Sequence, residues 1–266
     1  MDNSGQEVSS FSIVSGKGGV GKTNLALNLG YALHKASHQV ILMDCDLGLA
    51  NLDVLLGLAP DKNLQDLLMG NASVEEIVVP IESPNFDFLP SASGVPELID
   101  LDEDLQNSIF DKLKSVMDQY DFLLMDIGAG ISKTVLRFAS LSKERIVVIS
   151  PEPTSLTDSY ALIKVLSTEY NIRSFRIVVN QVESLEDGKM SFARLNSACK
   201  RFLNLELSYL GAVRTDPAVP TAVIRQVPLL KYAPSSKAGK DILALAVKLK
   251  RIREKQLEEH FSQENS

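Results

Sequence analysis

The sequence predicts one α/β domain in which a doubly wound, mostly parallel sheet carries helices on both faces. Two observations lead to this prediction: short apolar runs alternate with helix-length segments, and the centres of several runs are apolar without a break. Unbroken runs rich in Val, Ile and Leu are typical of parallel strands that are covered on both faces. The chain of 266 residues, 45% of them hydrophobic, is long enough to bury one such core.

Strands are expected where these apolar runs occur. The first run, FSIVS, precedes a glycine-rich stretch, and the runs QVILMD and DFLLMD both end in aspartate. The predicted strands cover residues 11–15, 39–44, 86–90, 121–126, 145–150, 175–180 and 207–213. Their alternation with helices implies right-handed crossovers within one sheet.

Helices are expected in the segments between the strands. The predicted helices cover residues 22–37, 64–69, 104–119, 132–141, 155–169, 191–204, 217–226 and 237–259. The acidic stretch ESLEDGK at 183–189 is interpreted as an exposed loop. In the last helix, apolar residues recur at helical spacing from Ile242 to Ile252, which predicts a stripe that packs on the body of the domain.

No Pro/Gly/Ser-rich linker, repeat or low-complexity tract divides the chain. We therefore expect a flexible N-terminus at 1–10, one α/β domain at 11–253 and a charged tail at 254–266. The tail has two interpretations. Either its charged helix frays into solvent, or Leu257 and Phe261 belong to an amphipathic tip that contacts the inner face of the cytoplasmic membrane.

Composition excludes several classes of protein. The net charge of −7 argues against a generally basic surface that coats nucleic acid. The two cysteines, Cys45 and Cys199, form no C-x-x-C pair, which argues against a disulfide framework or a zinc cluster and fits a reducing cytoplasm. The polar, acidic first ten residues do not resemble a signal peptide. No apolar run approaches the roughly 20 residues of a membrane-spanning helix.

The strongest motif is GKGGVGKT at residues 16–23, which follows a predicted strand, opens a predicted helix and matches G-x-x-x-x-G-K-[ST]. Glycines let backbone N–H groups turn inward around phosphates, and the helix N-terminus adds a positive dipole end. We expect the phosphates of a nucleotide here together with Mg²⁺, with Lys22 on the β- and γ-phosphates and Thr23 on the metal. The expected nucleotide-binding set is Gly16, Lys17, Gly18, Gly19, Val20, Gly21, Lys22, Thr23 and Asn24.

Lys17 has no obvious task inside this cradle, because Lys22 already occupies the natural phosphate position. An exposed ammonium at the start of the loop could instead reach the nucleotide of a facing molecule. The residues KGGVGKT resemble the deviant Walker A motif of the MinD/ParA superfamily. The resemblance implies an ATPase that forms a face-to-face homodimer around ATP, in which Lys17 acts catalytically on the partner's phosphates, and that separates after hydrolysis.

Carboxylates at two other strand ends agree with this resemblance. Asp44 and Asp46 are two residues apart, so in an extended chain both point to one face, whereas Cys45 between them should pack on the other. Asp126 ends another apolar strand. The resemblance implies that Asp46 is catalytic and orients the attacking water, and that Asp44 and Asp126 serve the metal together with Thr23.

The residues for the nucleoside and for the dimer come from the resemblance alone. Asn180, at the end of FRIVVN, resembles the asparagine that binds the adenine edge, and Arg214 and Asp216 lie in GAVRTDPAV, which resembles the loop that closes over the base. Glu152, in PEPTSLTDSY, resembles a residue of the dimer face that reaches the partner's ribose. Asparagine at a strand end and aspartate in a loop are also common turn residues.

Two longer stretches resemble the FlhG/FleN branch of flagellar-number ATPases: DLGLANLDVLLGL and PEPTSLTDSYALIKVL. The resemblance implies a cytoplasmic switch, at times peripheral to the membrane, that regulates the number and placement of flagella. Its implied partners are an FlhF-type GTPase, flagellar C-ring proteins or a FleQ-like transcription activator. The N-terminus lacks the D-Q-A-x-x-L-R element of many relatives, and Ile127 stands where the family commonly has Thr or Ser.

Other functions of the same fold remain as alternatives. A MinD-like regulator of the division site or a ParA-like DNA-partitioning ATPase would share the motifs, and basic residues do gather near the C-terminus between Lys231 and Arg253. The negative net charge argues against strong direct nucleic-acid binding. An iron–sulfur protein of the nitrogenase type is rejected, because Cys45 and Cys199 do not lie in loops that follow the relevant strands.

Overall fold

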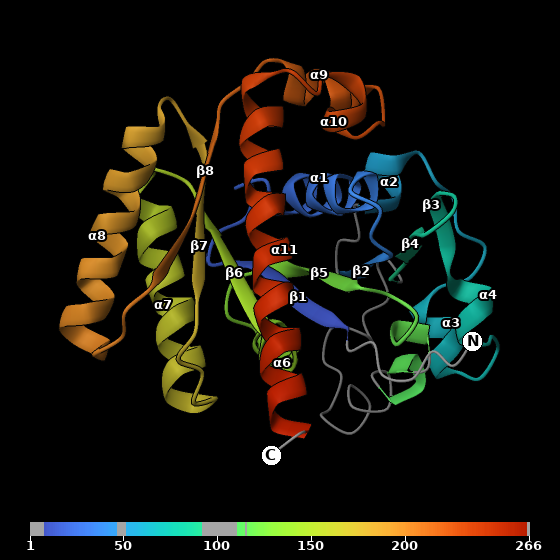
Figure 1. Ribbon diagram of the computed structural model, residues 1–266. Coiled ribbons are helices and arrows are strands. Elements are labelled where there is room, and N and C mark those ends of the chain that lie inside the picture. Colours follow the sequence, from blue (N-terminus) through green and yellow to red (C-terminus); the bar gives the residue numbers. More distant parts are fainter. Residues whose placement is uncertain (1–7, 47–51, 92–110, 115, 265–266) are drawn as a thin grey trace.

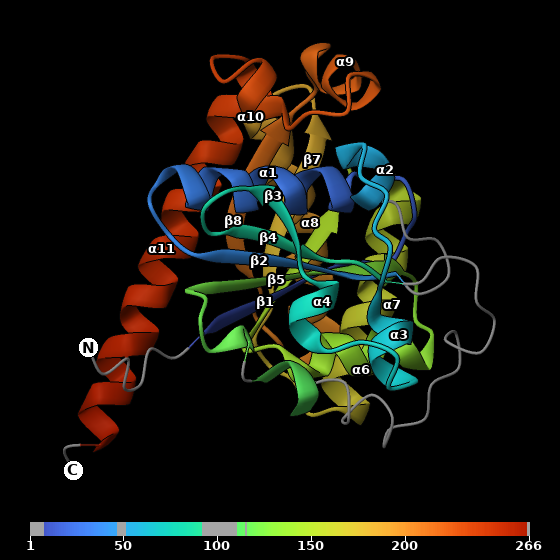
Figure 2. The ribbon, with the colours of Figure 1, turned by 90° about the vertical axis from the view of Figure 1, so that its right-hand side faces the viewer.

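Within the part of the chain that the structure describes, eight strands form one sheet in the order β3-β4-β2-β5-β1-β6-β7-β8. The computed structural model describes residues 8–46, 52–91, 111–114 and 116–264. Every neighbouring pair of strands is parallel except the edge pair β3–β4. The predicted α/β fold with a mostly parallel sheet is therefore confirmed, and the sheet lies between two layers of helices (Figures 1 and 2).

Seven of the strands occur where the apolar runs predicted them, each within about three residues at its ends. Their bounds are β1 Ser9–Ser15, β2 Val40–Cys45, β4 Phe86–Leu89, β5 Phe122–Ala129, β6 Glu144–Ile149, β7 Arg176–Val182 and β8 Ser208–Arg214. The eighth, β3 (Val79–Glu82), was not predicted, because four residues that include Pro80 give no strand pattern. Proline at such a position suits an edge strand, where one N–H group has no ladder partner.

The two faces of the sheet carry separate apolar cores. One face packs against α1 (Lys22–Lys35), α2 (Leu52–Leu56), α9 (Ala218–Ile224), α10 (Leu229–Tyr232) and α11 (Lys237–Glu264). The other packs against α3 (Leu64–Leu68), α4 (Val74–Ile77), α6 (Lys133–Leu141), α7 (Pro153–Glu169) and α8 (Leu185–Leu203). Figure 2 shows the strands between these two groups of helices. Among the described residues, every helix is too short or too polar to span a lipid bilayer.

The start of α8 corrects one expectation. Residues 183–189 were expected to form an exposed acidic loop, but the helix begins at Leu185. Ser184 and Asp187 form a capping box: the Asp187 N–H donates to the Ser184 hydroxyl at 3.2 Å, and the Ser184 N–H donates to the Asp187 carboxylate at 3.1 Å. Acidic residues in the first turn also suit the positive end of the helix dipole. The short helices α2, α4 and α10 were not predicted, and half of the predicted helix at 104–119 (residues 104–110 and 115) lies outside the described residues.

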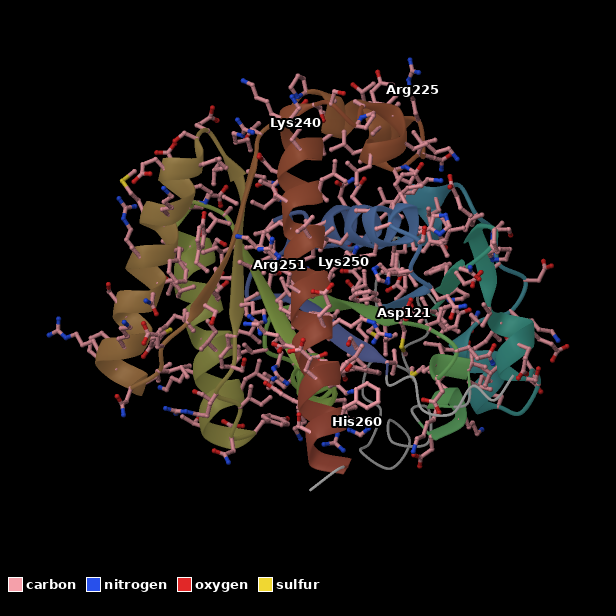
Figure 3. The ribbon with its side chains drawn as sticks, viewed as in Figure 1. Asp121, Arg225, Lys240, Lys250, Arg251 and His260 are labelled. Carbon is pink, nitrogen blue, oxygen red and sulfur yellow. The ribbon has the colours of Figure 1, made fainter. Side chains whose placement is uncertain are left out.

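The last helix is longer than predicted and is fastened to the sheet in its second half. It continues to Glu264 instead of ending at 259. Arg253 is buried and donates to Asp121, which precedes β5, at 2.6 Å, and Gln256 accepts a hydrogen bond from Ser9 at 2.8 Å. Figure 3 shows Asp121 beside this helix. These contacts hold the helix beyond its apolar stripe, while the role of the tail at 254–266 stays a prediction.

Candidate nucleotide site

The phosphate loop between β1 and α1 has a backbone conformation that suits an anion. Gly19 and Gly21 have positive φ angles of 79° and 86°, a region that side chains other than glycine rarely adopt. Gly21 is also the N-cap of α1, and no side chain in the described part of the chain caps this end of the helix. The N–H groups of the first turn are therefore available to a phosphate, which the helix dipole also favours.

This loop is held between α7 and β7. A Cβ on Gly16 would lie 2.1 Å from the carbonyl carbon of Asp158, so the loop and α7 touch backbone to backbone. On the other side, the Asn180 side chain donates to the Val20 carbonyl at 2.8 Å. A Cβ on Gly21 would lie only 2.5 Å from the same amide nitrogen. Gly16 is thus required by the backbone of α7, and Gly21 is favoured by its positive φ, while a shift of α7 would reach the loop directly.

Lys22 and Thr23 begin α1 and lie beside the carboxylates at the strand ends. Only 9% of Lys22 is exposed. Burial lowers its pKa, and the negative charges of Asp126 and Asp46 oppose that effect. The Thr23 hydroxyl is hydrogen-bonded to the Asp126 carboxylate. The structure therefore brings together the predicted phosphate lysine, the predicted metal hydroxyl and two of the predicted aspartates.

Two buried carboxylates face each other on adjacent strands. Asp44 of β2 and Asp126 of β5 are register partners, and they are 1% and 3% exposed. Among the described residues, nothing donates a hydrogen bond to Oδ2 of Asp44 or Oδ1 of Asp126. Burial and the nearby charge of Asp126 raise the pKa of Asp44 to about 8, and burial raises the pKa of Asp126 to about 6. Buried carboxylate oxygens without hydrogen-bond partners lower the stability of the folded chain, and a bound cation would offset this loss.

The donor set fits Mg²⁺ that arrives together with a nucleotide. Unpartnered carboxylate oxygens are the hard ligands that this ion prefers. In the described part of the chain, no group of three or more His, Cys, Asp or Glu side chains could hold a metal by itself. Mg²⁺ commonly uses one or two carboxylates, waters and substrate phosphates. The contributions expected from this chain are the Thr23 hydroxyl, Asp44 and Asp126.

Replacement of Asp44 by asparagine is expected to stabilise the nucleotide-free protein. In the folded chain the Asp44 pKa is about 8, above its ordinary value of 3.8, so the carboxyl group holds a proton that the unfolded chain has released. Stability therefore falls as pH rises between these values. We expect Asp44→Asn to raise the free energy of unfolding by about 1–3 kcal/mol at pH 8 and by less at pH 5.

Urea unfolding at both pH values, with and without Mg-ADP, tests this expectation. With Mg-ADP bound, Asp44→Asn should instead be less stable than the wild type, because the metal requires the Asp44 carboxylate. A destabilisation by Asp44→Asn of equal size at both pH values, without nucleotide, would contradict it.

Asp46 lies just beyond the end of β2. Its N–H group donates to Oδ1 of Asp44 at 2.9 Å. A Cβ on Gly128, near the end of β5, would lie 3.2 Å from Oδ1 of Asp46, so this carboxylate packs against the end of that strand. Cys45 is buried in the core on the opposite face, as the alternation of a strand predicts. Asp46 thus adjoins the buried pair through its N–H group, and its carboxylate is close enough to Lys22 to act on the pKa of that lysine.

Lys17 is held outside the cradle. Its ammonium is hydrogen-bonded to the Glu152 carboxylate and, at 3.0 Å, to the Thr154 hydroxyl, both at the start of α7. The Lys17 and Glu152 side chains are 36% and 59% exposed. An ion pair exposed to this degree contributes only about 0–1 kcal/mol. Glu152, predicted to reach a partner molecule, therefore binds Lys17 of its own chain here, through a contact that is easily exchanged for another.

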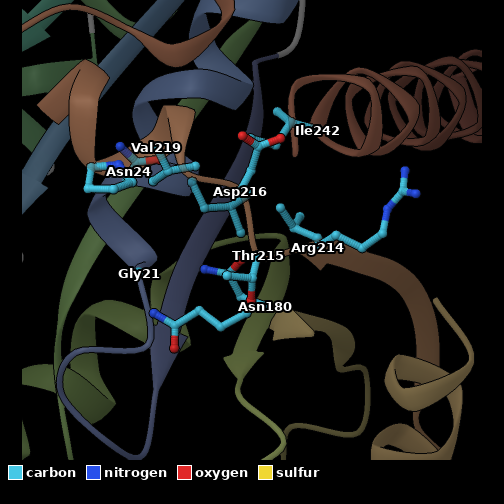
Figure 4. Close-up of a pocket in the computed structure, with 12 residues that line it drawn as sticks. Gly21, Asn24, Asn180, Arg214, Thr215, Asp216, Val219 and Ile242 are labelled. Atoms are coloured by element: carbon cyan, nitrogen blue, oxygen red, sulfur yellow. The ribbon is translucent and has the colours of Figure 1, made fainter. Parts of the chain in front are cut away.

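A cavity of about 390 Å³ adjoins the end of the phosphate loop. It is lined by residues of five elements, α1, β7, β8, α9 and α11, which meet around it (Figure 4). Its walls combine apolar side chains such as Leu25, Val219 and Ile242 with the polar groups of Asn24 and Asn180. A mostly apolar hollow of this size with few polar groups suits the base of a nucleotide.

Arg214 and Asp216 line this cavity, but their charged groups bind within the protein. The Arg214 guanidinium forms two hydrogen bonds of 2.8 Å with Asp241 of α11 and extends away from Gly21 (Figure 4). The Asp216 carboxylate accepts from the Ala218 N–H at 2.9 Å and so begins α9. Burial is the largest single influence on the pKa of Asp216 and raises it, but the N–H groups of Ala218, Ala238 and Lys237 together lower this pKa below its ordinary value. Both residues shape the loop beside the base cavity, and their contact with a base stays a prediction.

Sequence reasoning did not identify two side chains that touch the site. Thr154 contacts Lys17, and the Gln181 side chain donates to the Gly19 carbonyl at 3.2 Å. Alternation along β7 would place Gln181 on the face opposite Asn180, so the pattern gave no signal for it. A hydroxyl in the first turn of a helix signals capping more often than a bond to a distant lysine.

Comparison with known proteins reveals relatives over most of the chain. A family model described as an AAA domain matches residues 8–175. The antiactivator FleN of Pseudomonas aeruginosa is 36% identical over 237 residues, which cover 89% of this chain and 84% of FleN. The flagellum site-determining protein YlxH of Helicobacter pylori is 35% identical over 249 residues, which cover 92% of this chain and 83% of YlxH.

The fold is also similar to solved structures. The septum site-determining protein MinD of Pyrococcus horikoshii, solved as a complex with Mg-ADP, superposes with a TM-score of 0.76 at 27% sequence identity. The match covers 92% of this chain and 97% of that protein. The likeness therefore extends over nearly all of both chains.

Proposed function

Because the chain belongs to the MinD/ParA superfamily of ATPases, in the branch that includes FleN and YlxH, we propose that it is a dimerising switch that hydrolyses ATP slowly and regulates flagella. The ATP-bound state would be a homodimer and the ADP-bound or empty state a monomer. The output of the switch would be the choice of partner, with hydrolysis as its timer.

One observation carries the proposal: the site has two lysines in different environments. Lys22 is buried beside Asp126 and Asp46, whereas Lys17 lies at the surface, held by an exposed carboxylate and a hydroxyl. A second lysine at the surface is not needed for the phosphates of the chain's own nucleotide, because Lys22 would already lie beside them. A surface lysine beside the phosphate loop suits the phosphates of a facing molecule.

The arrangement supports a division of work among the residues. Loop N–H groups and Lys22 would bind the β- and γ-phosphates, and Asp46 would orient a water molecule for in-line attack on the γ-phosphate. Lys17 of a second molecule would add positive charge where negative charge develops. Mg²⁺ bound by Thr23, Asp44 and Asp126 would neutralise phosphate charge.

The partners are proposed from the relatives. FleN is named an antiactivator and YlxH a flagellum site-determining protein. We therefore propose that the dimer recognises a FleQ-like transcription activator, flagellar C-ring proteins or an FlhF-type GTPase. A peripheral membrane contact through the tail at 254–266 is proposed as a second site of action, in a protein that otherwise resides in the cytoplasm.

One observation favours DNA binding as a second candidate function. Lys240, Lys250 and Arg251 lie along α11 (Figure 3), where they could face phosphates of a duplex. The net charge of −7 opposes this interpretation. If the chain bound DNA only with ATP, and if this binding weakened steeply with salt, the DNA-binding function would be favoured over recognition of a protein partner.

The proposal is tested in solution and in cells. Light scattering after size-exclusion chromatography should give a dimer with ATP and Mg²⁺ and a monomer with ADP. Expression in Pseudomonas aeruginosa that lacks FleN should restore the normal number of flagella, and the Lys22→Ala variant should not. A chain that stays monomeric with saturating ATP and Mg²⁺ would refute the switch, and flagella that are unaffected would refute the flagellar role.

A further inference from the structure

We propose that Gln181 is a positioning residue for the phosphate loop: its side chain, paired with that of Asn180, turns two successive loop carbonyls away from the nucleotide. This inference rests on the proposed function, because it assumes that the loop binds phosphates. It adds a residue that lies 162 positions from the loop carbonyl it contacts.

An irregularity in β7 brings both amides to one place. Consecutive side chains of a regular strand point to opposite faces of the sheet. The pairing of β7 with β8 shifts register between Val179 and Val182, and Gln181 has a positive φ of 59°. This bulge-like turn of the backbone lets the two neighbours point to the same loop. Asn180 donates to the Val20 carbonyl at 2.8 Å, and Gln181 donates to the Gly19 carbonyl at 3.2 Å.

Because a peptide bond is planar, these two contacts also fix the direction of the loop N–H groups. Within one planar trans peptide, the C=O of a residue and the N–H of the next point in opposite directions. With the carbonyls of Gly19 and Val20 fixed toward β7, the N–H groups of Val20 and Gly21 must point the other way. Left-handed Gly19 and Gly21 on either side of Val20 permit this arrangement. The two amides therefore aim loop donors at the place where phosphate oxygens would lie.

The contact of Gln181 with the phosphate loop suggests a role beyond folding. Its positive φ is strained for a residue without a short polar side chain, and this conformation lets the side chain reach the loop. Gln181 is exposed, so its bond to the loop stabilises the fold little. A residue kept in an unfavourable conformation, for a weak and exposed hydrogen bond to the phosphate loop, fits a role in binding.

Two substitutions separate the roles of the side chain. Gln181→Gly relieves the positive φ and removes the amide, and Gln181→Leu keeps the bulk and removes only the polar group. In both full-length variants we expect ADP and inorganic pyrophosphate, measured by calorimetry and by competition in the presence of Mg²⁺, to bind about three- to tenfold more weakly, the effect of one hydrogen bond. The melting temperature of Gln181→Gly should stay within about 3 °C of the wild type.

Gln226 offers a matched control. It is also an exposed glutamine with a positive φ, of 54°, and its side chain donates to a backbone carbonyl, that of Val54 in α2, at 2.8 Å. Gln226→Gly and Gln226→Leu should leave both affinities unchanged. The proposal is overturned if the Gln181 variants bind ADP like the wild type, if only ADP and not pyrophosphate is weakened, or if the Gln226 variants weaken binding equally.

The result is distinguishable from a failure of the proposed function itself. If the wild-type chain binds neither ADP nor ATP with Mg²⁺, the nucleotide switch is wrong. If the wild type binds and the Gln181 variants bind equally well, the switch stands and the positioning role is wrong.

Discussion

Asp46→Ala is expected to lower the rate of ATP hydrolysis about a hundredfold or more while the protein still forms a dimer with ATP and Mg²⁺. The expectation follows from where this carboxylate lies. It lies one residue beyond the end of β2, next to the buried register pair of Asp44 and Asp126 but outside it, and its Oδ1 would lie 3.2 Å from a Cβ on Gly128 near the end of β5. A carboxylate beside the phosphate loop that is not needed for the metal can orient a water molecule, and its removal stops the timer without removing ATP.

ATP binding should not weaken in this variant. Asp46 is a negative charge near Lys22 and Asp126, and its presence contributes to the raised pKa of Asp126. The removal of a like charge from the vicinity of a triphosphate lowers repulsion. We therefore expect Asp46→Ala to hold ATP at least as tightly as the wild type, with dimers that persist for many times longer after excess ATP is removed.

The neighbouring carboxylate provides the matched control. Asp44→Ala removes an acidic residue only two positions away, but one whose buried Oδ2 lacks a partner in the described structure and suits the metal. It should weaken the binding of Mg-ATP and leave the protein monomeric. The assignment of roles would be refuted if Asp46→Ala hydrolysed ATP at the wild-type rate, or if Asp44→Ala and Asp46→Ala behaved alike in light scattering.

The sheet and its helices were largely predictable because their signals are local. Apolar runs mark buried strands, and the glycines of residues 16–21 with Lys22 and Thr23 mark a phosphate loop by spacing alone. The early start of α8 was also within reach, since Ser184 and Asp187 show the capping-box spacing. The acidic charge of this stretch is equally typical of an exposed loop, and only the capping pair indicates a helix start.

The contacts that complete the site depend on chain geometry that no local pattern contains. Gln181 points to the loop only because β7 is irregular at that residue. Lys17 reaches α7 because that helix begins at Pro153, two residues earlier than predicted, which brings Glu152 and Thr154 to the edge of the loop. Arg214 is paired with Asp241, a partner 27 positions away on another element. In each of these contacts, two segments that are far apart in the sequence come together only in the complete fold.

A mixture of two inactive variants is expected to recover ATP hydrolysis if Lys17 acts across a dimer. Lys17→Ala keeps Asp46, and Asp46→Ala keeps Lys17. In a mixed dimer, the nucleotide held by the Lys17→Ala chain has its own Asp46 and receives Lys17 from its neighbour, so one of the two sites is complete. With random pairing, an equal mixture should show about a quarter of the wild-type activity, although each variant alone is nearly inactive.

The structure explains why Lys17 should be free to make this exchange. Its bonds to Glu152 and Thr154 are exposed, and an ammonium gains far more from phosphate charge in a closed interface than from one carboxylate in water. Lys17→Ala should accordingly bind ADP as well as the wild type does, because Lys22 and the loop N–H groups are intact. Loss of ADP binding in this variant would instead assign Lys17 to its own loop.

The mixing experiment separates the two arrangements by a qualitative result. The variants are combined without nucleotide, and phosphate release is followed after ATP and Mg²⁺ are added. The matched control is a mixture of Lys22→Ala with Lys17→Ala. In a mixed dimer of these two variants, the nucleotide site of the Lys17→Ala chain would receive Lys17 from its neighbour. This mixture should therefore recover activity only if Lys22→Ala still enters the dimer. If Lys17 serves the nucleotide of its own chain, no mixture of Lys17→Ala with Asp46→Ala contains a complete site. Activity would then stay at the sum of the separate variants, and the dimer would have no catalytic reason to form.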